Sequence, residues 1–415
     1  MKVTDFILQN TYLYNINRQK YDLNKVQEQI TTQQKVNRPS DSPLGTARII
    51  RFTEQLGSIQ TYMSNAENAN GFVTKTISSM QSIQTIVSDI QSLLVQTDNA
   101  LNSGSFENYA QKIESYLANI VDYANEEYDG KYLFAGSTFY DKPFSFDEAT
   151  LDTTFNSSTP NGSHTIRLSK SIEQKINIGG DDLFASVMKL NGNFDRSAAV
   201  GTTSDLTNTI YDADGNEYGV EITYTKTADN QYSMQYNITD DSSNVIANDT
   251  LDLAFDATTG ELVTVDGADP SAISIDTDSP KIRFKIDPTN LKEADKAAAL
   301  AQDIDLKGDF FNTLASISTK LANGEKPTAN QVALINDFNN HILNKLSEEG
   351  NIANRIDSVL NQLTNEETNI KELVSNEKDT DMVKAALDLQ TLNYSLEYAY
   401  KISSMILPQS LLDYL

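Results

Sequence analysis

The sequence contains no cysteine and no tryptophan, and only two of its 415 residues are histidine. Without cysteine the chain can form no disulfide, no thiolate metal site and no cysteine nucleophile. It also lacks any apolar run near the roughly 18 residues that a membrane-spanning helix needs, so we expect no membrane insertion. The first residues lack the charged and then apolar stretches of a cleaved secretory signal. Taken alone, these absences predict a cytoplasmic protein.

Candidate catalytic and metal-binding groups are scarce. His164 and His341 lie far apart, and neither accompanies the Gly-x-Ser-x-Gly pattern of a nucleophile elbow. We expect His341, which follows two asparagines, to be a solvated helix residue. Acidic side chains alternate at 212–217 as in a calcium loop, but the glycine comes two positions earlier than an EF-hand requires. Asp-Gly favours a hairpin turn, so we interpret this run as a turn. The sequence predicts no enzyme, no cofactor and no metal site.

Negative charge dominates the chain and is concentrated in one segment. The formal net charge is −26, and residues 195–290 include 18 acidic but only five basic residues. Such a segment is expected to form a solvated outer surface. Binding to nucleic-acid phosphates requires clustered lysine and arginine, so we expect no nucleic-acid partner.

Heptad repeats mark both ends of the chain. Ile16, Leu23 and Ile30 recur at every seventh position, and Gln19 is a polar residue in the same seam. The C-terminal part keeps this spacing over Ile356, Val359, Leu363, Ile370 and Leu373, and then less strictly over Leu389, Leu392, Leu396, Ala399 and Ile406. A narrow apolar stripe on a polar helix needs a partner. The two ends are therefore predicted to pair as a left-handed coiled coil.

Helical and β patterns alternate between these ends. Pro43 follows Ser42, a good N-cap residue, so a second long helix is predicted to begin there, with a kink or an end at Gly71. A short break is expected at 348–350 in the last helical stretch. Further helices are expected at 108–127, 294–301, 310–324 and from 327 onward.

The fold class is therefore α+β, with long coiled-coil-like terminal helices and a helical bundle that carries inserted β-rich outer regions. The β regions are indicated by period-two alternation and by turn residues between 141 and 290. Four parts are predicted: a terminal coiled-coil domain (1–42 and 350–415), a helical core (43–140 and 291–349), a first β-rich region (141–199) and a second, acidic β-rich domain (200–290).

Three short motifs resemble the flagellin superfamily. They are Asn-Arg-Pro-Ser-Asp-Ser-Pro at 37–43, Leu-Phe-Ala-Gly at 133–136 and the ending Ser-Leu-Leu-Asp-Tyr-Leu at 410–415. The resemblance covers about residues 1–145 and 300–415, and within the superfamily it is closest to the hook-associated protein 3 family of hook–filament junction proteins. Residues 200–290 are similar to an outer β domain of the flagellar hook protein.

The resemblance implies a non-enzymatic structural protein of the bacterial flagellum that joins hook and filament. It also implies type III export without a cleaved signal, which reverses the cytoplasmic prediction and makes the protein secreted. The implied partners are copies of itself in a ring or tube, the other hook-associated junction protein, flagellin and a cytoplasmic export chaperone. Flagellin itself is the alternative within the superfamily. A secreted β-domain adhesin on a helical stalk is a further alternative, and it would need a pocket of exposed aromatic rings.

The candidate contact residues for assembly and for the chaperone lie in the two heptad seams. In the C-terminal seam, Leu389, Leu392 and Leu396 have the spacing of one helical face. The N-terminal seam contributes Ile16, Leu23 and Ile30. We predict that these six side chains form the assembly surface.

Overall fold

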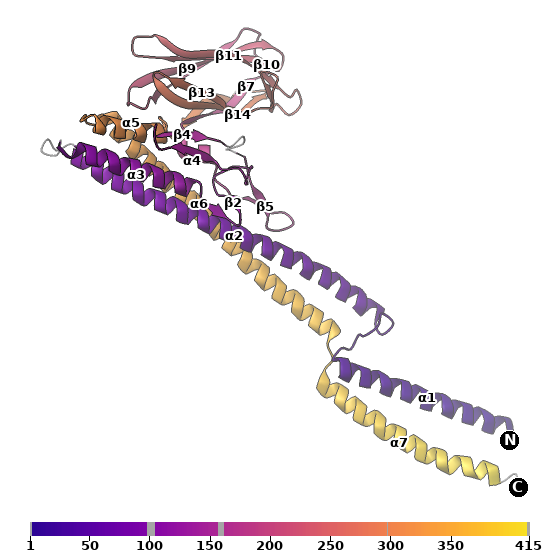
Figure 1. The fold of residues 1–415 in the computed structure, drawn as a ribbon. Helices are drawn as coiled ribbons and strands as arrows, with labels where there is room; N and C mark the ends of the chain where they lie inside the picture. Colours follow the sequence, from indigo (N-terminus) through magenta and orange to yellow (C-terminus); the bar gives the residue numbers. More distant parts are fainter. Residues whose placement is uncertain (1, 98–103, 157–161, 297, 413–415) are drawn as a thin grey trace. The chain divides into compact units, whose positions relative to one another are not determined.

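The computed structural model describes residues 2–97, 104–156, 162–296 and 298–412, and the side chains of 2–6, 8, 9 and 403–412 are outside that description. The side chains of Ile406, which belongs to the predicted seam, and of the ending motif therefore lie outside the described part. The fold is α+β, as predicted (Figure 1). The chain divides into two compact units, Met1–Ala66 with Ser358–Leu415 and Glu67–Asp357.

The first unit is built from antiparallel helix pairs. α1 (Lys2–Thr32) lies beside α7 (Met382–Leu412), and the first turn of α1 is next to the last turn of α7 (Figure 1). The first part of α2 (Pro43–Thr97) meets the last part of α6 (Ala329–Lys378). Two polar pairs join α2 to α6 there, Arg48 with Glu377 at 2.9 Å and Gln60 with Glu367 at 3.2 Å.

The predicted helix start at Pro43 is confirmed. Ser42 Oγ accepts a hydrogen bond from the N–H of Gly45 at 3.1 Å, which satisfies one of the free donors of the first helical turn. The Asp41 carboxylate accepts from the N–H groups of Arg38 (2.9 Å) and Asn37 (3.1 Å). These backbone bonds hold the pKa of Asp41 below its usual value. The motif at 37–43 thus folds as a turn followed by a helix cap.

The predicted C-terminal coil is two helices rather than one. α6 ends at Lys378 and α7 begins at Met382. The Asp381 carboxylate accepts hydrogen bonds from the N–H groups of Val383 (3.0 Å) and Lys384 (3.1 Å). This N-cap stabilises a new helix start, because a side-chain acceptor before the first turn satisfies its free donors.

Four helices form the core of the second unit: the later part of α2, α3 (Phe106–Ala124), α5 (Phe310–Ala322) and the earlier part of α6. Ser79 Oγ of α2 donates to the carbonyl of Tyr123 at 2.9 Å, and Ser318 Oγ of α5 donates to the carbonyl of Ala110 at 3.2 Å. Their fully buried apolar side chains include Met80, Ile83, Ile90, Ile113, Leu117, Ile317 and Ile335.

Two predicted helix breaks are wrong. α2 continues through Gly71, where the Tyr128 side chain occupies the space that a Cβ atom would need. The glycine therefore permits close packing and does not end the helix. α6 likewise continues through 348–350, because Glu349 is buried against the core instead of lying in a solvated loop.

Small hairpins cover one side of these helices. The tight turn at Asp129 and Gly130 joins β1 (Glu127–Tyr128) to β2 (Lys131–Tyr132), and both turn residues have positive φ. The next elements are β3 (Phe144–Asp147), β4 (Asp152–Phe155), β5 (Thr165–Arg167), β6 (Glu173–Lys175) and the short α4 (Gly180–Phe184). Phe144 and Phe184 pack on Phe311 of α5, with ring centroids 5.6 and 5.0 Å away. These aromatic contacts join the hairpins to the helical core.

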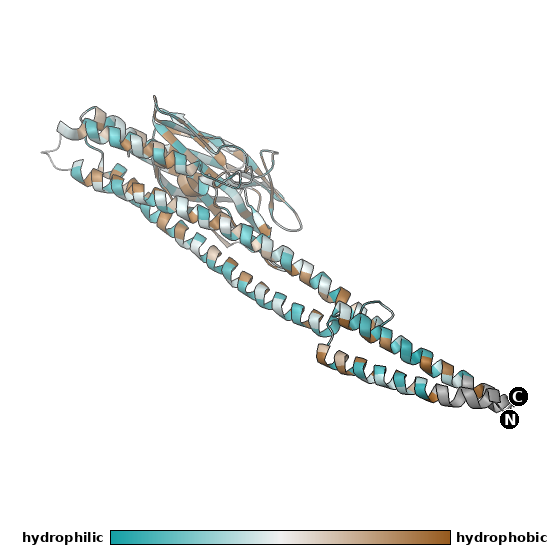
Figure 2. Cartoon of the chain, turned by 60° about the horizontal axis from the view of Figure 1, so that its bottom comes forward, coloured by the Kyte–Doolittle hydropathy of each residue, from teal (hydrophilic) through white to brown (hydrophobic). Residues whose placement is uncertain are grey.

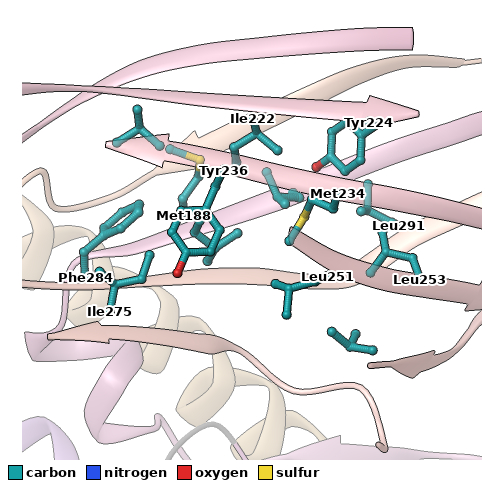
Figure 3. Close-up of a cluster of buried hydrophobic side chains, with 14 of the residues drawn as sticks. Met188, Ile222, Tyr224, Met234, Tyr236, Leu251, Leu253, Ile275, Phe284 and Leu291 are labelled. Carbon is teal, nitrogen blue, oxygen red and sulfur yellow. The ribbon is translucent and has the colours of Figure 1, made fainter. Parts of the chain in front are cut away.

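Two sheets face each other in a sandwich. One sheet has the strand order β12-β11-β10-β9-β8 and the other β13-β14-β7-β15. The strands are β7 (Val187–Asp195), β8 (Thr203–Tyr211), β9 (Glu217–Ala228), β10 (Gln231–Thr239), β11 (Val245–Phe255), β12 (Leu262–Val265), β13 (Ile273–Asp278), β14 (Lys281–Ala294) and β15 (Ala298–Ile304). Figure 3 shows buried side chains of both sheets, such as Phe284 and Met234, filling the space between them.

The predicted helix at 294–301 is wrong. β14 extends to Ala294, and β15 pairs antiparallel with β7. Local alanine content favours a helix, but pairing with the edge of β7 outweighs that weak preference. The strands therefore run past residue 290, where the sequence analysis places the start of the helical core. β7 belongs to the predicted first β-rich region, so the two predicted β-rich regions share one sheet.

Candidate assembly surface of the terminal helices

The six predicted contact residues lie on the faces by which α1 and α7 pair. Ile16 is buried. The other five residues, Leu23, Ile30, Leu389, Leu392 and Leu396, are half-buried. The structure thus brings the N-terminal seam and the later part of the C-terminal seam together within one chain, whereas the earlier part, from Ile356 to Leu373, lies on α6. Their role in assembly stays a prediction.

Polar bonds hold the register of this helix pair. The Gln19 amide donates to Ser395 Oγ at 3.2 Å, so the polar residue predicted in the seam has a partner on α7. The Tyr12 hydroxyl donates to the carbonyl of Ala399. Because a polar group in an apolar seam needs its partner opposite, these bonds disfavour a shifted pairing.

A second apolar stripe lies on the opposite face of α7. Val383, Leu387, Tyr394 and Tyr398 are 73%, 60%, 56% and 65% exposed. At about 100° per residue their spacing places them on one face, about half a turn away from the three leucines of the seam. α7 is therefore apolar on two sides, and only one side is covered by α1.

α1 has the same two-sided character. Ile7, Tyr14 and Tyr21 recur at every seventh position and are 59%, 66% and 66% exposed. Figure 2 shows hydrophobic residues, in brown, among hydrophilic ones along the described parts of both terminal helices. We call these three residues, together with Val383, Leu387, Tyr394 and Tyr398, the outer stripes. The sequence analysis missed them, although the second series of heptad positions in the first helix was available as a signal.

The outer stripes have the composition of a protein–protein interface. Tyrosine combines a large apolar ring with a polar hydroxyl, and aromatic residues are enriched where proteins associate. An exposed apolar surface of this kind indicates an interaction site. The arrangement can provide packing contacts, and none of its side chains is a nucleophile paired with a base.

His341 and Asp212, two of the predicted candidates for catalysis and metal binding, have structural roles. His341 is buried, and its Nε2 lies 2.8 Å from the carbonyl oxygen of Asp182. This observation corrects the expectation of a solvated residue. Burial lowers the pKa of His341. Asp212 accepts hydrogen bonds within its own turn, as expected for a hairpin turn. Among the described residues, no cluster of three histidine or acidic residues is arranged to hold a metal ion.

Models of known families match most of the chain. The bacterial flagellin N-terminal helical region matches residues 3–138, and the bacterial flagellin C-terminal helical region matches residues 332–415. These two matches cover both terminal helices and most of the helical core. The chain is a member of the flagellin superfamily. The flagellar basal body protein FlaE D2 domain matches residues 182–340, which include the β sandwich.

Solved structures of flagellar proteins are similar to this superfamily member. FlgL from Xanthomonas campestris is 15% identical, with a TM-score of 0.46 over 78% of this chain and 99% of that chain. A putative flagellar hook-associated protein from Vibrio parahaemolyticus is 10% identical, with a TM-score of 0.47 over 82% and 100%. The flagellar junction protein FlgL from Legionella pneumophila is 14% identical, with a TM-score of 0.44 over 80% and 100%. No curated protein sequence matches the chain.

The two connectors between helices of this flagellin-type unit are bonded to each other. The N–H of Lys35 donates to the carbonyl of Lys378 at 2.8 Å, and the N–H of Thr380 donates to the carbonyl of Gln33 at 2.9 Å. The α1–α2 connector and the α6–α7 connector therefore form one joint.

No helix among the described residues is long and apolar enough to cross a membrane.

Proposed function

We propose that this flagellar structural protein is a junction subunit between hook and filament, and that its outer stripes pack against neighbouring subunits. The observation that carries the proposal is the two-sided apolar character of α1 and α7. The inner faces are used within the chain, and the outer faces are exposed (for example, 65% for Tyr398). An assembly that covers these faces removes apolar surface from water, at about 25 cal/mol per Å².

The proposed partners follow from the same surface. Copies of the chain in a ring or tube, the other hook-associated junction protein and flagellin would each offer apolar helical faces to the outer stripes. A cytoplasmic export chaperone would cover the outer stripe of α7 before type III export, by binding the helix in an apolar groove of the chaperone. On this proposal the protein is secreted and works in the extracellular flagellum.

The adhesin alternative has less support. The sandwich has a cavity of about 420 Å³ lined in part by Phe194, Tyr224 and Tyr232. These three rings are only 5%, 1% and 4% exposed. A glycan-binding site presents aromatic faces to its ligand, and these rings are packed into the core instead.

The double variant Tyr394→Ser and Tyr398→Ser tests the proposal in cells. We expect normal amounts of protein but loss of attached filaments, because the α7 outer stripe no longer packs on its neighbour. Tyr140→Ser is the control, since Tyr140 is 77% exposed and lies in the other unit. Firmly attached filaments in the double variant would contradict the proposal.

Immunogold labelling of flagella separates the remaining alternatives. A junction subunit gives a single band at the base of the filament. Labelling along the whole filament would instead identify a flagellin, and labelling away from the flagellum would favour the adhesin.

A further inference from the structure

The turn that joins β8 to β9 is pre-formed by its own side chains. Asp212 Oδ1 accepts hydrogen bonds from the N–H groups of Asp214 (2.9 Å) and Asn216 (2.8 Å). Asp212 Oδ2 accepts from the Asn216 amide at 2.9 Å. Aspartate commonly stabilises turns by such bonds to the backbone two or more residues on. The backbone carbonyl groups of the turn remain available for bonds to another element.

Three side chains at the start of α6 bind these carbonyl groups. All three donors are neutral, and the donor of the first bond, Gln331, is completely buried. The bonds are Gln331 Nε2 to Ala213 O (2.8 Å), Thr328 Oγ1 to Asp214 O (3.1 Å) and Asn330 Nδ2 to Gly215 O (2.8 Å). Three successive turn residues thus each accept a bond from a side chain at the helix start.

The contact is too close to admit a side chain at its centre. Gly215 has φ +81°, and a Cβ atom there would lie 2.7 Å from Thr328 Oγ1 and 3.1 Å from the nitrogen of Gln331. Asp214 adds bonds to α5, accepting from Ser316 Oγ at 2.6 Å and pairing with Lys320 at 3.3 Å. The turn is therefore held by both α5 and α6.

A second turn with the same motif is free. Asp240 and Asn244 repeat the Asp-x-x-x-Asn pattern between β10 and β11, with the Asn244 N–H donating to Asp240 Oδ1 at 2.8 Å. This turn lies at the same end of its sheet as the first, because it is two antiparallel connections further on. Residues 241–245 are exposed. Whether such a turn binds the helices therefore depends on the residues that face it and not on the turn motif.

The sandwich has further attachments to the rest of the second unit. The chain enters and leaves it at one place, where Ser186 Oγ donates to the carbonyl of Leu306 at 2.6 Å. On one face of β14, basic side chains also pair with acidic ones, including Lys285 with Asp181 (2.5 Å) and Lys281 with Asp152 (2.9 Å). The N–H of Tyr211 at the end of β8 also donates to the carbonyl of Lys307 at 2.8 Å, whereas the pairs on β14 are ionic.

We infer that the turn at 212–216 is a clasp that fixes the orientation of the β sandwich on the helical core, and that it keeps this orientation when salt screens the ionic pairs of β14. The hydrogen bonds from Gln331, Asn330 and Thr328 are neutral, so they persist when salt screens the charged contacts of Lys320 with Asp214 as well as the pairs of β14. This inference does not rest on the proposed function.

Distance measurements between two spin labels on the whole chain test the clasp. Because the sequence has no cysteine, Asp89→Cys on α2 and Val263→Cys on β12 give two unique labelling sites, both at exposed positions. The clasp variant is Asn330→Ala with Gln331→Ala, which removes two donors and leaves the turn unchanged. Asn244→Ala is the matched control, because it removes an amide from the free turn. Electron–electron double resonance is recorded at low salt and at about 1 M NaCl, where the Debye length is about 3 Å.

We expect one narrow distance for the parent and the Asn244→Ala variant at both salt concentrations. The clasp variant should lose this narrow distance at high salt, while its far-UV circular dichroism shows intact helices. A clasp variant that stays as narrow as the parent at high salt overturns the inference. A parent that broadens at high salt overturns it as well, and that result does not depend on how the variants fold.

Discussion

Glu349 on α6 has a carboxyl group that the fold buries, and its Oε2 atom has no hydrogen-bond partner. Burial raises the pKa of Glu349 from 4.5 to about 7, while Lys175 and Lys345 lower it and Glu348 raises it further. The folded state therefore binds this proton more tightly than the unfolded state. The resulting stability is fully present below pH 4.5 and is lost as the pH rises through about 7.

The variant Glu349→Gln should remove this pH dependence. At pH 8 the free energy of unfolding should increase by roughly 2–3 kcal/mol, because the variant no longer buries a charge, and near pH 4 it should change little. Urea unfolding at both pH values measures the difference. Glu348→Gln is the control, because it removes an exposed carboxylate that pairs with Lys345 at 3.2 Å and should lower the pKa of Glu349 only slightly. An equal change at both pH values would show that Glu349 acts through packing.

Glu293 joins several strands of the sandwich through one buried carboxylate. Lys226 and Glu293 are 1% and 2% exposed, and Lys226 Nζ lies 3.6 Å from Glu293 Oε1. The Tyr232 hydroxyl donates to the same oxygen at 3.2 Å, and Arg196 pairs with Oε2 at 3.4 Å. Removing one member of such a network leaves a buried charge without its partner.

We therefore expect Glu293→Ala to lower the free energy of unfolding by about 3–5 kcal/mol, the usual cost of breaking a buried pair. The double variant Glu293→Gln with Lys226→Met should recover much of that loss, because it removes both charges. Chemical denaturation of the three proteins provides the comparison. A double variant no more stable than Glu293→Ala would mean that shape, and not charge, holds these strands together.

At the scale of elements, the two stripes of α7 should have separable effects. The triple variant Leu389→Ser, Leu392→Ser and Leu396→Ser weakens the face that meets α1. Fully burying a leucine contributes about 1.5–3 kcal/mol, and these half-buried residues contribute less each. Amide exchange in α1 should accelerate in this variant. It should stay unchanged in the outer-stripe variant Tyr394→Ser with Tyr398→Ser. Faster exchange of α1 in both variants would mean that the stripes are one surface.

The long periodic elements were predictable because local and tertiary signals agree in them. The heptads of α1 and the cap at Ser42 and Pro43 needed no knowledge of distant residues. The strand at 298–304 was not predictable in this way, since its alanines favour a helix and only the edge of β7 makes it a strand. Gly71 was misinterpreted for a similar reason, because its meaning depends on Tyr128, far along the chain.

The candidate site was predicted only in part, again because pairing is a tertiary property. The apolar spacing identified Leu389, Leu392 and Leu396 as a contact face. It could not decide whether that face meets α1 or another subunit. Once α1 covers it, the exposed face with Tyr394 and Tyr398 becomes the better candidate for assembly.

At the scale of the whole molecule, the basic residues of the acidic segment 195–290 are used in ion pairs within the chain. All five basic residues of 195–290 form ion pairs within the chain: Arg196 and Lys226 with Glu293, Lys281 and Arg283 with Asp152, and Lys285 with Asp181. The charges that this segment leaves unpaired toward solvent are therefore acidic. Phosphate binding needs available basic groups, and the basic residues of this segment are already paired.

The sandwich should be removable as a unit if the cuts are placed where the chain enters and leaves it. Ser186 Oγ and the carbonyl of Leu306 are 2.6 Å apart, so a short Gly/Ser linker can replace residues 187–304 without strain. We expect the remaining protein to stay helical and to melt cooperatively, as followed by circular dichroism. A deletion of 143–288 is the contrasting variant, because it removes Phe144 and Phe184 from the aromatic cluster around Phe311. That protein should lose its cooperative transition. Equal melting of both deletions would show that the hairpins are not part of the helical core.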